Sequence, residues 1–453
     1  MRFNISDGAL HILETLNAAG YEAYLVGGCV RDLLRGVLPR DWDICTSALP
    51  MQTKACFPGC RIIETGLKHG TVTILWDGNS FEVTTYRTDG TYSDGRRPDG
   101  VQFVRDLRED LSRRDFTINA IAMDAGGALQ DPFSGAEDIR RKIVRCVGEP
   151  DQRFREDGLR IMRALRFASS LGFSIREGTG ESICRNKGML SYVAAERINV
   201  ELCKLLTGVE PRMVLEKYGC VLCEFWPELG GMIGKEQHNP QHCHDIWQHT
   251  IAAVESAPRE RVLRLTMLLH DIGKPRRFTL DDKGAGHLYG HPAVSAKLAG
   301  QMLRRLKFDN DTRKQVVELI AHHDARLEPQ SKLIRRWLNK LGEERFYQLL
   351  EVKRADYMGR RKEPAQGRLD ELREIKEIAD GILSERQCFA LRDLAVDGRD
   401  VIKAGAEPGP AVGAVLHFLM DRVLEEELPN EREALRKEAA RYIKAEAGEP
   451  PDA

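Results

Sequence analysis

The 453-residue chain lacks long hydrophobic runs, a regular cysteine pattern and an excess of one charge. No stretch approaches the roughly 18 consecutive apolar residues that span a bilayer. Asp7 interrupts the amino-terminal MRFNISDGAL, where a secretory leader needs apolar residues. The 11 Cys are scattered, and the CxxC pair Cys220 and Cys223 has no second pair to complete a four-ligand zinc site. We therefore expect a cytoplasmic protein with reduced thiols and no membrane segment.

The composition is typical of a soluble protein with a sizeable core. Hydrophobic residues make up 42% and charged residues 30% of the chain, which excludes a fibrous or wholly disordered protein. The formal net charge of -1 argues weakly against a nucleic-acid partner. Positive charge is nevertheless concentrated locally, because between Arg153 and Arg166 five arginines meet only two acids.

The length favours two to four domains, at roughly 100–200 residues per domain. Before residue 148, short β-like runs at 23–26, 42–45, 71–76 and 81–86 alternate with helical segments and predict an α+β domain. From about residue 149 onward, apolar residues recur every three or four positions, which predicts helices. Turn-rich breaks divide the chain into predicted domains at 1–148, 149–210, 211–360 and 361–453.

A strand, a Gly27-Gly28 turn and a helix carrying Arg31 are predicted from the segment YLVGGCVRD, which begins at residue 24. Backbone N–H groups at such a turn, together with a helix amino terminus and an arginine, bind phosphate oxygens. Adjacent glycines after a strand are common, so this signal alone is weak.

Asp41 and Asp43 strengthen the interpretation, because residues two apart on a strand point to the same face. Their mutual repulsion would be relieved by Mg²⁺, which prefers oxygen ligands and substrate phosphates. Glu82, on a later predicted strand, is a candidate third carboxylate, and two metal ions would then serve one phosphoryl transfer. For Asp41 and Asp43 alone, the alternative is a polar loop.

Together these residues resemble the nucleotidyltransferase head of the class II CCA-adding enzymes and bacterial poly(A) polymerases, which has the DNA polymerase β catalytic fold. The resemblance continues over roughly residues 20–205, in the family's order, through the segments KHGTV at Lys68, RRDFTINA at Arg113, DP with a following glycine at Asp131, EDGLR at Glu156 and ERI at Glu196. It implies an α+β head followed by an all-α neck, body and RNA-binding tail. The implied reaction is metal-dependent transfer of CMP and AMP from CTP and ATP to the 3′ hydroxyl of tRNA, without a nucleic-acid template.

Asp157, Arg160, Arg163 and Arg166 are spaced by three and form a stripe on one side of a predicted helix. The alternative is a row of solvated salt pairs. Cytosine and adenine both present an amino donor beside a ring-nitrogen acceptor, so a carboxylate and a guanidinium side by side select them over uracil and guanine. Asp157 and Arg160 are the candidate pair.

The resemblance implies further nucleotide contacts. Glu156 would hold the Asp157 and Arg160 arrangement, while Arg163 and Arg166 would also contact the nucleotide. Arg114 and Asp115 would lie at the ribose and phosphate end, with Asn119 in the same motif as an additional nucleotide-binding residue.

Histidines gather in the second half of the chain, with seven of the 12 between His238 and His291. Imidazoles mixed with carboxylates suit a divalent transition metal or magnesium. The segment LLHDIGKP resembles the central motif of the HD phosphohydrolase domain. That resemblance implies His249, His270, Asp271 and Asp356 as ligands of a divalent metal, with His291 and His322 as candidates for a second metal or for substrate phosphate. It also implies hydrolysis of 2′,3′-cyclic phosphates or phosphomonoesters, and the alternative is an inactive structural domain.

Three functions compete at this point. The first is a CCA-adding enzyme with an accessory HD domain, which takes tRNA, ATP and CTP and needs no obligate protein partner. The second is a poly(A) polymerase or a partial enzyme that adds only CC or only A. The third is an HD phosphohydrolase whose head merely binds RNA or nucleotide. The KHGTV segment favours a CCA-adding enzyme over a poly(A) polymerase, and the stretch 88–104, which resembles a flexible loop of full CCA-adding enzymes, favours it over a CC-only enzyme. Enzymes that add only A can carry both features.

Overall fold

The computed structural model describes residues 3–90, 100–236, 245–280, 286–287, 289–360, 362–385 and 387–446. It divides the chain into two compact units, Met1–Gly231 with Met302–Asp309 and Met232–Gln301 with Asn310–Ala453. Most of the predicted flexible loop, residues 91–99, lies outside the described residues. The finer division into four domains stays a prediction.

The first unit contains a seven-stranded mixed sheet in the order β3-β4-β5-β2-β1-β8-β9. Only β2 and β5 pair in parallel among the described strands of this sheet. The strands are β1 (Ala23–Val26), β2 (Asp43–Thr46), β3 (Arg61–Ile63), β4 (Thr71–Trp76), β5 (Asn79–Thr85), β8 (Ala122–Met123) and β9 (Leu129–Gln130). The α+β head is therefore confirmed, with two of the four predicted strands reproduced residue for residue.

Helices cover this sheet and continue beyond it in the same unit. They are α1 (Asp7–Ala18), α2 (Gly28–Leu34), α3 (Pro50–Cys56), α4 (Leu107–Ser112), α5 (Gly135–Arg140), α6 (Pro150–Glu156), α7 (Leu159–Leu171), α8 (Glu177–Asn186), α9 (Ala195–Leu206) and α10 (Pro211–Leu222). Short strand pairs of this unit lie outside the sheet. Strand β6 (Arg87–Asp89) pairs with β7 (Val101–Phe103), and β10 (Ile143–Val144) pairs with β11 (Ser174–Ile175). Helix α7 buries Ile161, Met162 and Leu165 and packs against α9, as its three- and four-residue spacing predicts.

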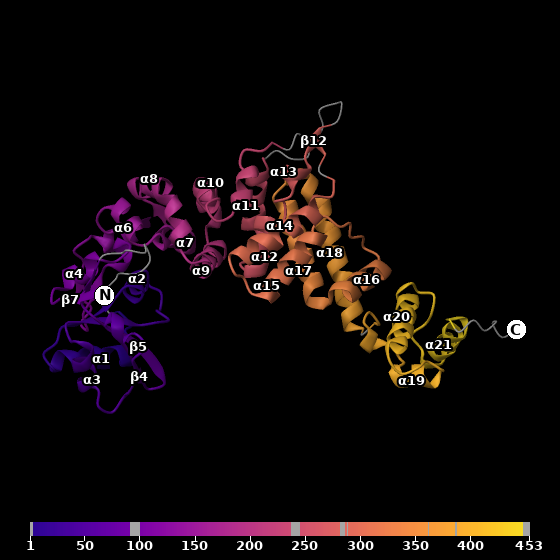
Figure 1. The fold of residues 1–453 in the computed structure, drawn as a ribbon, viewed down its shortest axis with the longest axis horizontal. Coiled ribbons are helices and arrows are strands. Elements are labelled where there is room, and N and C mark those ends of the chain that lie inside the picture. The colour runs from indigo at the N-terminus through magenta and orange to yellow at the C-terminus, as the bar shows by residue number, and fades with distance from the viewer. Residues whose placement is uncertain are drawn as a thin grey trace. The chain divides into compact units, whose positions relative to one another are not determined.

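The second unit is almost entirely helical (Figure 1). Its elements are α11 (Ile246–Ser256), α12 (Arg261–Leu269), α13 (Lys274–Arg277), β12 (Thr279–Leu280), β13 (Gly286–His287), α14 (His291–Arg305), α15 (Asn310–His322), α16 (Ser331–Leu341), α17 (Glu343–Met358), α18 (Lys362–Ser384), α19 (Gly398–Lys403), α20 (Pro410–Leu424) and α21 (Arg432–Glu446). The end of α14, from Met302 onward, belongs to the first unit. The core of the second unit is formed where α11 and α12 pack against α15 and α17. Within the described residues, no helix is long and apolar enough to cross a membrane.

Helix α18 begins at Lys362, at the start of the predicted domain 361–453. Its buried Leu372, Ile375 and Ile382 pack with Phe346 of α17 and Ile334 of α16. A separate small core, built around Leu419 and other residues of 388–439, unites the last three helices. The core that includes α18 is distinct from the core of the last three helices, because the apolar face of α18 has its partners in α16 and α17.

Candidate active site and candidate metal centre

The first site begins at the turn between β1 and α2. Gly27 has a φ of +79°, a conformation that glycine adopts without the strain of a side chain. A Cβ atom on Gly27 would lie 3.4 Å from Nη1 of Arg114 and 3.6 Å from a carboxylate oxygen of Asp43. The backbone of the turn is thus held against two of the predicted site residues.

A cavity of about 610 Å³ opens beside this turn. The predicted residues that line it are Gly27, Gly28, Arg31, Asp41, Asp43, Arg114, Asp115, Asn119, Asp157, Arg160, Arg163 and Arg166. Glu82 and Glu156 do not line it. Residues separated by more than a hundred positions in the sequence therefore meet around one volume large enough for a small ligand.

The carboxylates lie at one end of the β2 strand. Asp41 precedes the strand instead of lying on it as predicted, and Asp43 is its first residue. In the parallel register of β2 and β5, Asp43 is opposite Glu82. Burial, reinforced by the charges of Glu82 and Asp41, raises the pKa of the Asp43 carboxyl, although Arg114 opposes the shift. Three neighbouring carboxylates with oxygen donors fit Mg²⁺, which would relieve this repulsion.

Arg114 is held by a residue that the sequence reasoning missed. Asp110 of α4 is fully buried, and it accepts from Nη2 of Arg114 at 3.1 Å and from Nη2 of Arg113 at 2.8 Å. Burial opposes ionisation, but the two arginines lower the pKa of Asp110. The charged carboxylate therefore fixes both guanidinium groups at the cavity wall.

The proposed base-reading residues each have a partner of their own. Asp157 lies between α6 and α7 rather than on the helix of the three arginines as predicted. It accepts from Nη2 of Arg197 at 2.9 Å and from the backbone N–H of Leu159 at 3.0 Å. Arg160 donates from Nη1 to Glu156 at 2.6 Å. Arg197 also lines the cavity, yet the sequence reasoning noted only its motif and gave it no role. These contacts hold a carboxylate and a guanidinium in fixed directions.

A chain of hydrogen bonds connects the glycine turn with helix α7. Arg31 donates to Oδ1 of Asn119 at 2.9 Å, and Asn119 donates to Oδ1 of Asp115 at 3.1 Å. Nε of Arg163 donates to Oδ2 of Asp115 at 2.7 Å. Burial would raise the pKa of Asp115, but Arg163 and Asn119 lower it to about 2. Asp115 is therefore ionised and joins the two sides of the cavity.

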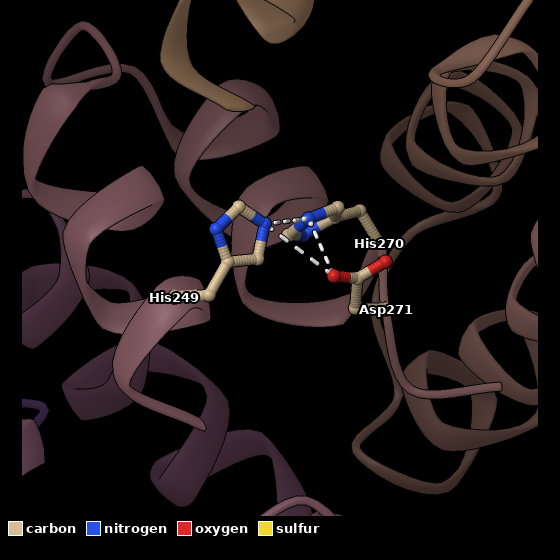
Figure 2. Close-up of side chains that lie close together, drawn as sticks. All are labelled: His249, His270 and Asp271. Carbon is tan, nitrogen blue, oxygen red and sulfur yellow. Dashed lines mark hydrogen bonds and ion pairs between the residues drawn. The ribbon is translucent and has the colours of Figure 1, made fainter. Parts of the chain in front are cut away.

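The second site lies in the second unit, where buried imidazoles and carboxylates converge. Nε2 of His249 is 3.3 Å from Nε2 of His270, 3.4 Å from Oδ2 of Asp271 and 3.0 Å from Oδ1 of Asp356. Figure 2 shows the two imidazoles pointing toward each other, with one oxygen of Asp271 facing them. The four ligands implied by the HD resemblance are thus brought together.

The hydrogen bonds of the imidazoles set their orientation. Nδ1 of His249 lies 3.1 Å from the carbonyl oxygen of Gly359, and Nδ1 of His270 lies 2.7 Å from that of Met267. An Nδ1–H that donates to a carbonyl leaves Nε2 as the lone-pair donor. Each ring therefore presents the nitrogen that a metal would need.

A second group shares Asp271 with the first. Nε2 of His291 lies 3.4 Å from Oδ1 of Asp271 and 3.2 Å from Nε2 of His323. The ligand atoms of Asp271, His291 and His323 all lie within 4.8 Å of one another. One carboxylate is thus placed between two sets of nitrogen donors.

The prediction that His322 joins this group is wrong, and its neighbour His323 takes that place. The ring of His322 packs edge-on against Trp337 at 5.3 Å, away from the other imidazoles. His322 is the last residue of α15 and His323 follows it in a turn, so the two side chains point in different directions. The His-His-Asp motif in the sequence did not show which of the two histidines faces the group.

The pKa values of two imidazoles in this second site differ. Burial alone would lower the pKa of His270, but Asp271 and Asp356 raise it to about 9, so binding of a metal at its Nε2 would release a proton. Burial lowers the pKa of His323 to about 3, so this ring is neutral. Despite burial, cationic neighbours hold the pKa of Asp271 well below its usual range, and Nζ of Lys274 lies 2.7 Å from it. Mixed nitrogen and oxygen donors fit a divalent transition metal.

Comparisons with known families match three segments of the chain. Residues 23–145 match the family described as the poly A polymerase head domain. Residues 172–218 match the probable RNA and SrmB-binding site of polymerase A, and residues 291–439 match the putative tRNA nucleotidyltransferase domain 2.

Relatives with curated names are similar over almost the whole chain. A CCA-adding enzyme of Latilactobacillus sakei is 38% identical over 441 residues, which cover 95% of this chain and 97% of that protein. One from Lactiplantibacillus plantarum is 37% identical over 427 residues, covering 94% and 93%. A third, from Geobacillus thermodenitrificans, is 55% identical over 200 residues, and that match covers 44% of this chain and only 49% of the relative.

Solved structures of CCA-adding enzymes are similar to this chain in fold. The crystal structure of the Bacillus stearothermophilus CCA-adding enzyme in complex with CTP is similar with a TM-score of 0.72 and 33% identity, covering 97% of this chain and 98% of that one. The Thermotoga maritima CCA-adding enzyme complexed with tRNA has a TM-score of 0.60 at 17% identity, covering 98% and 100%, which shows a shared fold alone.

Proposed function

Because the chain belongs to the CCA-adding enzyme family, we propose that it adds C, C and A to the 3′ end of tRNA from CTP and ATP without a nucleic-acid template. The observation that carries the proposal is the cavity in which Asp41 and Asp43 face the same volume as Asp157 and Arg160. Groups suited to phosphoryl transfer and groups suited to base selection thus share one ligand space. Family membership also supports tRNA binding by the helical tail.

In the proposed reaction, the 3′ hydroxyl of the RNA attacks the α-phosphate of the bound nucleotide and pyrophosphate leaves. The Gly27-Gly28 turn and Arg31 bind the phosphates through N–H groups and a guanidinium. Magnesium bound by Asp41 and Asp43, with Glu82 nearby, would neutralise the negative charge on the phosphate oxygens and favour ionisation of the attacking hydroxyl. The protein's own contribution is positioning and charge stabilisation rather than covalent chemistry.

Base selection follows from the donors and acceptors at the other end of the cavity. The Asp157 carboxylate accepts from the amino group of cytosine or adenine, and Arg160 donates to the adjacent ring nitrogen. Uracil and guanine present a carbonyl to Asp157 and an N–H to Arg160, so both contacts are lost. Glu156 and Arg197 keep the two groups in register through their ion pairs.

Extension of tRNA transcripts that end at the discriminator base, at C or at CC tests this proposal. With CTP and ATP, we expect products read at single-nucleotide resolution to end at CCA and then stop. With ATP alone, only the transcript ending at CC should be extended. Long A tracts would show a poly(A) polymerase, and addition of A without any addition of C would show an A-only enzyme. Either result would overturn the proposal.

We also propose that the second unit is a metal-dependent phosphohydrolase acting on 2′,3′-cyclic phosphates or phosphomonoesters. The supporting observation is the convergence of His249, His270, Asp271 and Asp356, with imidazole Nε2 atoms facing carboxylate oxygens. A divalent metal held by these four residues would supply Lewis acidity toward a phosphate ester. Asp271, His291 and His323 are the candidates for binding a second metal or the substrate phosphate.

Hydrolysis of 2′,3′-cyclic AMP with added divalent metal tests this proposal. We expect the wild-type protein to release product and the Asp271→Ala variant to release none. Wild-type protein that binds metal but shows no turnover would identify a structural domain instead.

The two adjacent histidines provide a matched test of the metal centre. His323→Gln is expected to lower the metal content after dialysis against Mn²⁺, Ni²⁺ or Zn²⁺, because it removes a donor that faces His291 and Asp271. His322→Gln makes the same chemical change one residue away and is expected to leave the metal content unchanged. Elemental analysis of the two dialysed variants gives the comparison. Equal metal contents would contradict the assignment of His323.

A further inference from the structure

Phe167, a residue of α7 that the sequence analysis did not single out, lies among three arginines of the candidate active site. The guanidinium carbon of Arg166 is 3.6 Å from the centre of the Phe167 ring. Those of Arg31 and Arg163 are 5.3 Å and 5.4 Å away. All three distances fall within the roughly 6 Å at which a cation is attracted to an aromatic face. Phe167 itself lines the cavity and is only 3% exposed.

The arginines come from two different helices and are anchored separately at their polar ends. Arg31 of α2 pairs with Asp32 at 3.0 Å, and Arg166 of α7 pairs with Glu201 at 2.9 Å. Arg163 is bound to Asp115. Without further support, three like charges in one buried region repel one another. The electron-rich ring gives them a common neutral neighbour that attracts each of them.

The ring is itself held in place from behind. Phe116, which is fully buried, meets Phe167 edge-on with ring centroids 5.7 Å apart and an interplanar angle of 79°. Edge-to-face contact of this kind is a favourable aromatic geometry. Phe116 also follows Asp115 directly, and its N–H donates to that carboxylate at 2.8 Å. The orientation of the ring is therefore fixed by the same segment that anchors Arg163.

We propose that Phe167 is a positioning residue for the triphosphate of the incoming nucleotide, and that it acts by holding Arg31, Arg163 and Arg166 toward the cavity. The proposal rests on the proposed nucleotidyl transfer. Guanidinium groups match phosphate oxygens in geometry and charge, whereas selection of the base is assigned to Asp157 and Arg160. Loss of the ring thus weakens binding of the triphosphate and leaves binding of the nucleoside unchanged.

The test replaces the ring while keeping apolar volume. For Phe167→Leu, we expect the dissociation constants of CTP and ATP, measured with Mg²⁺ and without tRNA, to rise about tenfold, which is the order expected when several cation–π contacts are lost together. The dissociation constant of cytidine is expected to stay the same. In the transfer assay, KM should rise more than kcat falls. Phe167→Tyr keeps the ring and is expected to restore CTP binding.

A matched control separates positioning from general packing. Phe57 is similarly buried, at 4% exposure, in the same unit, and its ring contacts His11. Phe57→Leu is expected to lower Tm without changing the ratio of the CTP and cytidine dissociation constants. If Phe167→Leu fails to fold, Phe167→Met takes its place, with the same expected rise for CTP alone.

A double-mutant cycle with Arg166→Met tests whether the ring acts through the arginine that lies nearest to it. The combined loss is expected to be smaller than the product of the single losses, because the two residues share one interaction. Independent losses, equal weakening of CTP and cytidine in Phe167→Leu, or failure of Phe167→Tyr to restore binding would each overturn the role of Phe167. Wild-type protein that binds no CTP would instead overturn the proposed function.

Discussion

Replacing Asp43 by asparagine is expected to lower the rate of CMP and AMP transfer by at least about a hundredfold, the order found when one preorganised charge-stabilising group is removed. The substitution keeps the shape of the side chain and removes the charge that would hold magnesium. Because burial and Glu82 raise the pKa of Asp43 in the folded protein, its ionised form lowers the free energy of unfolding at neutral pH. Asp43→Asn should therefore unfold at an equal or higher Tm in the metal-free state. Single-turnover transfer and thermal unfolding measure the two effects.

Glu64→Gln is the control for this prediction. Glu64 makes an ion pair with Lys54 on the surface of the same unit and does not line the cavity. The same loss of a carboxylate charge should leave the transfer rate unchanged. A near-normal transfer rate in Asp43→Asn would show that the carboxylate takes no part in the reaction. A lower Tm would show that the lost activity reflects damage to the fold.

Asp157→Asn is expected to reduce discrimination against UTP and GTP by about tenfold or more, in line with the value of one bidentate base contact. A carboxylate only accepts, whereas an amide also donates to the carbonyl groups that uracil and guanine present. The change also weakens the ion pair with Arg197, so CTP and ATP should bind less tightly. Misincorporation of each nucleotide on a tRNA ending at the discriminator base measures the effect.

Asp151 provides the comparison on the preceding helix. It pairs with Arg185 at 3.2 Å and does not line the nucleotide cavity. Asp151→Asn should keep the discrimination of the wild type. If Asp157→Asn also keeps it, base selection resides elsewhere in the protein.

Local patterns were enough to predict much of the catalytic head. The residues of β1 and β4 are apolar or β-branched and bounded by turn signals, so both strands could be delimited from sequence. Asp41 was predicted on the strand but lies two residues before it, because the pattern of alternate residues does not show where β2 begins. That most of the predicted nucleotide-binding residues share one cavity was expected from the resemblance, since spacing alone brings only neighbours together.

Residues that act through tertiary contacts could not be found in this way. Asp110 resembles any acid in a charged helix until its burial beneath Arg113 and Arg114 is seen. Phe167 is apolar at a core position of α7, and nothing in its spacing indicates that guanidinium groups surround it. The choice between His322 and His323 depends on where α15 ends and how the chain turns after it. Each of these assignments requires the packing of elements distant in sequence.

The bulk charge also misled, because a net charge of -1 conceals the arginines around the cavity. Several of these arginines are neutralised by buried or partly buried acids such as Asp110 and Glu201. Under the proposed function, these arginines recognise a ligand by direction rather than attract nucleic acid in general. A net charge close to zero is therefore compatible with a specific nucleotide-binding site.

The central claim is that the protein itself, without an RNA template, selects cytosine and adenine. Equilibrium binding of CTP, ATP, UTP and GTP to the free wild-type protein, with Mg²⁺ and no tRNA, tests it most directly. The account predicts that CTP and ATP bind at least about tenfold more tightly than UTP and GTP, because Asp157 and Arg160 match only the first two bases. Equal affinities for all four nucleotides would contradict it.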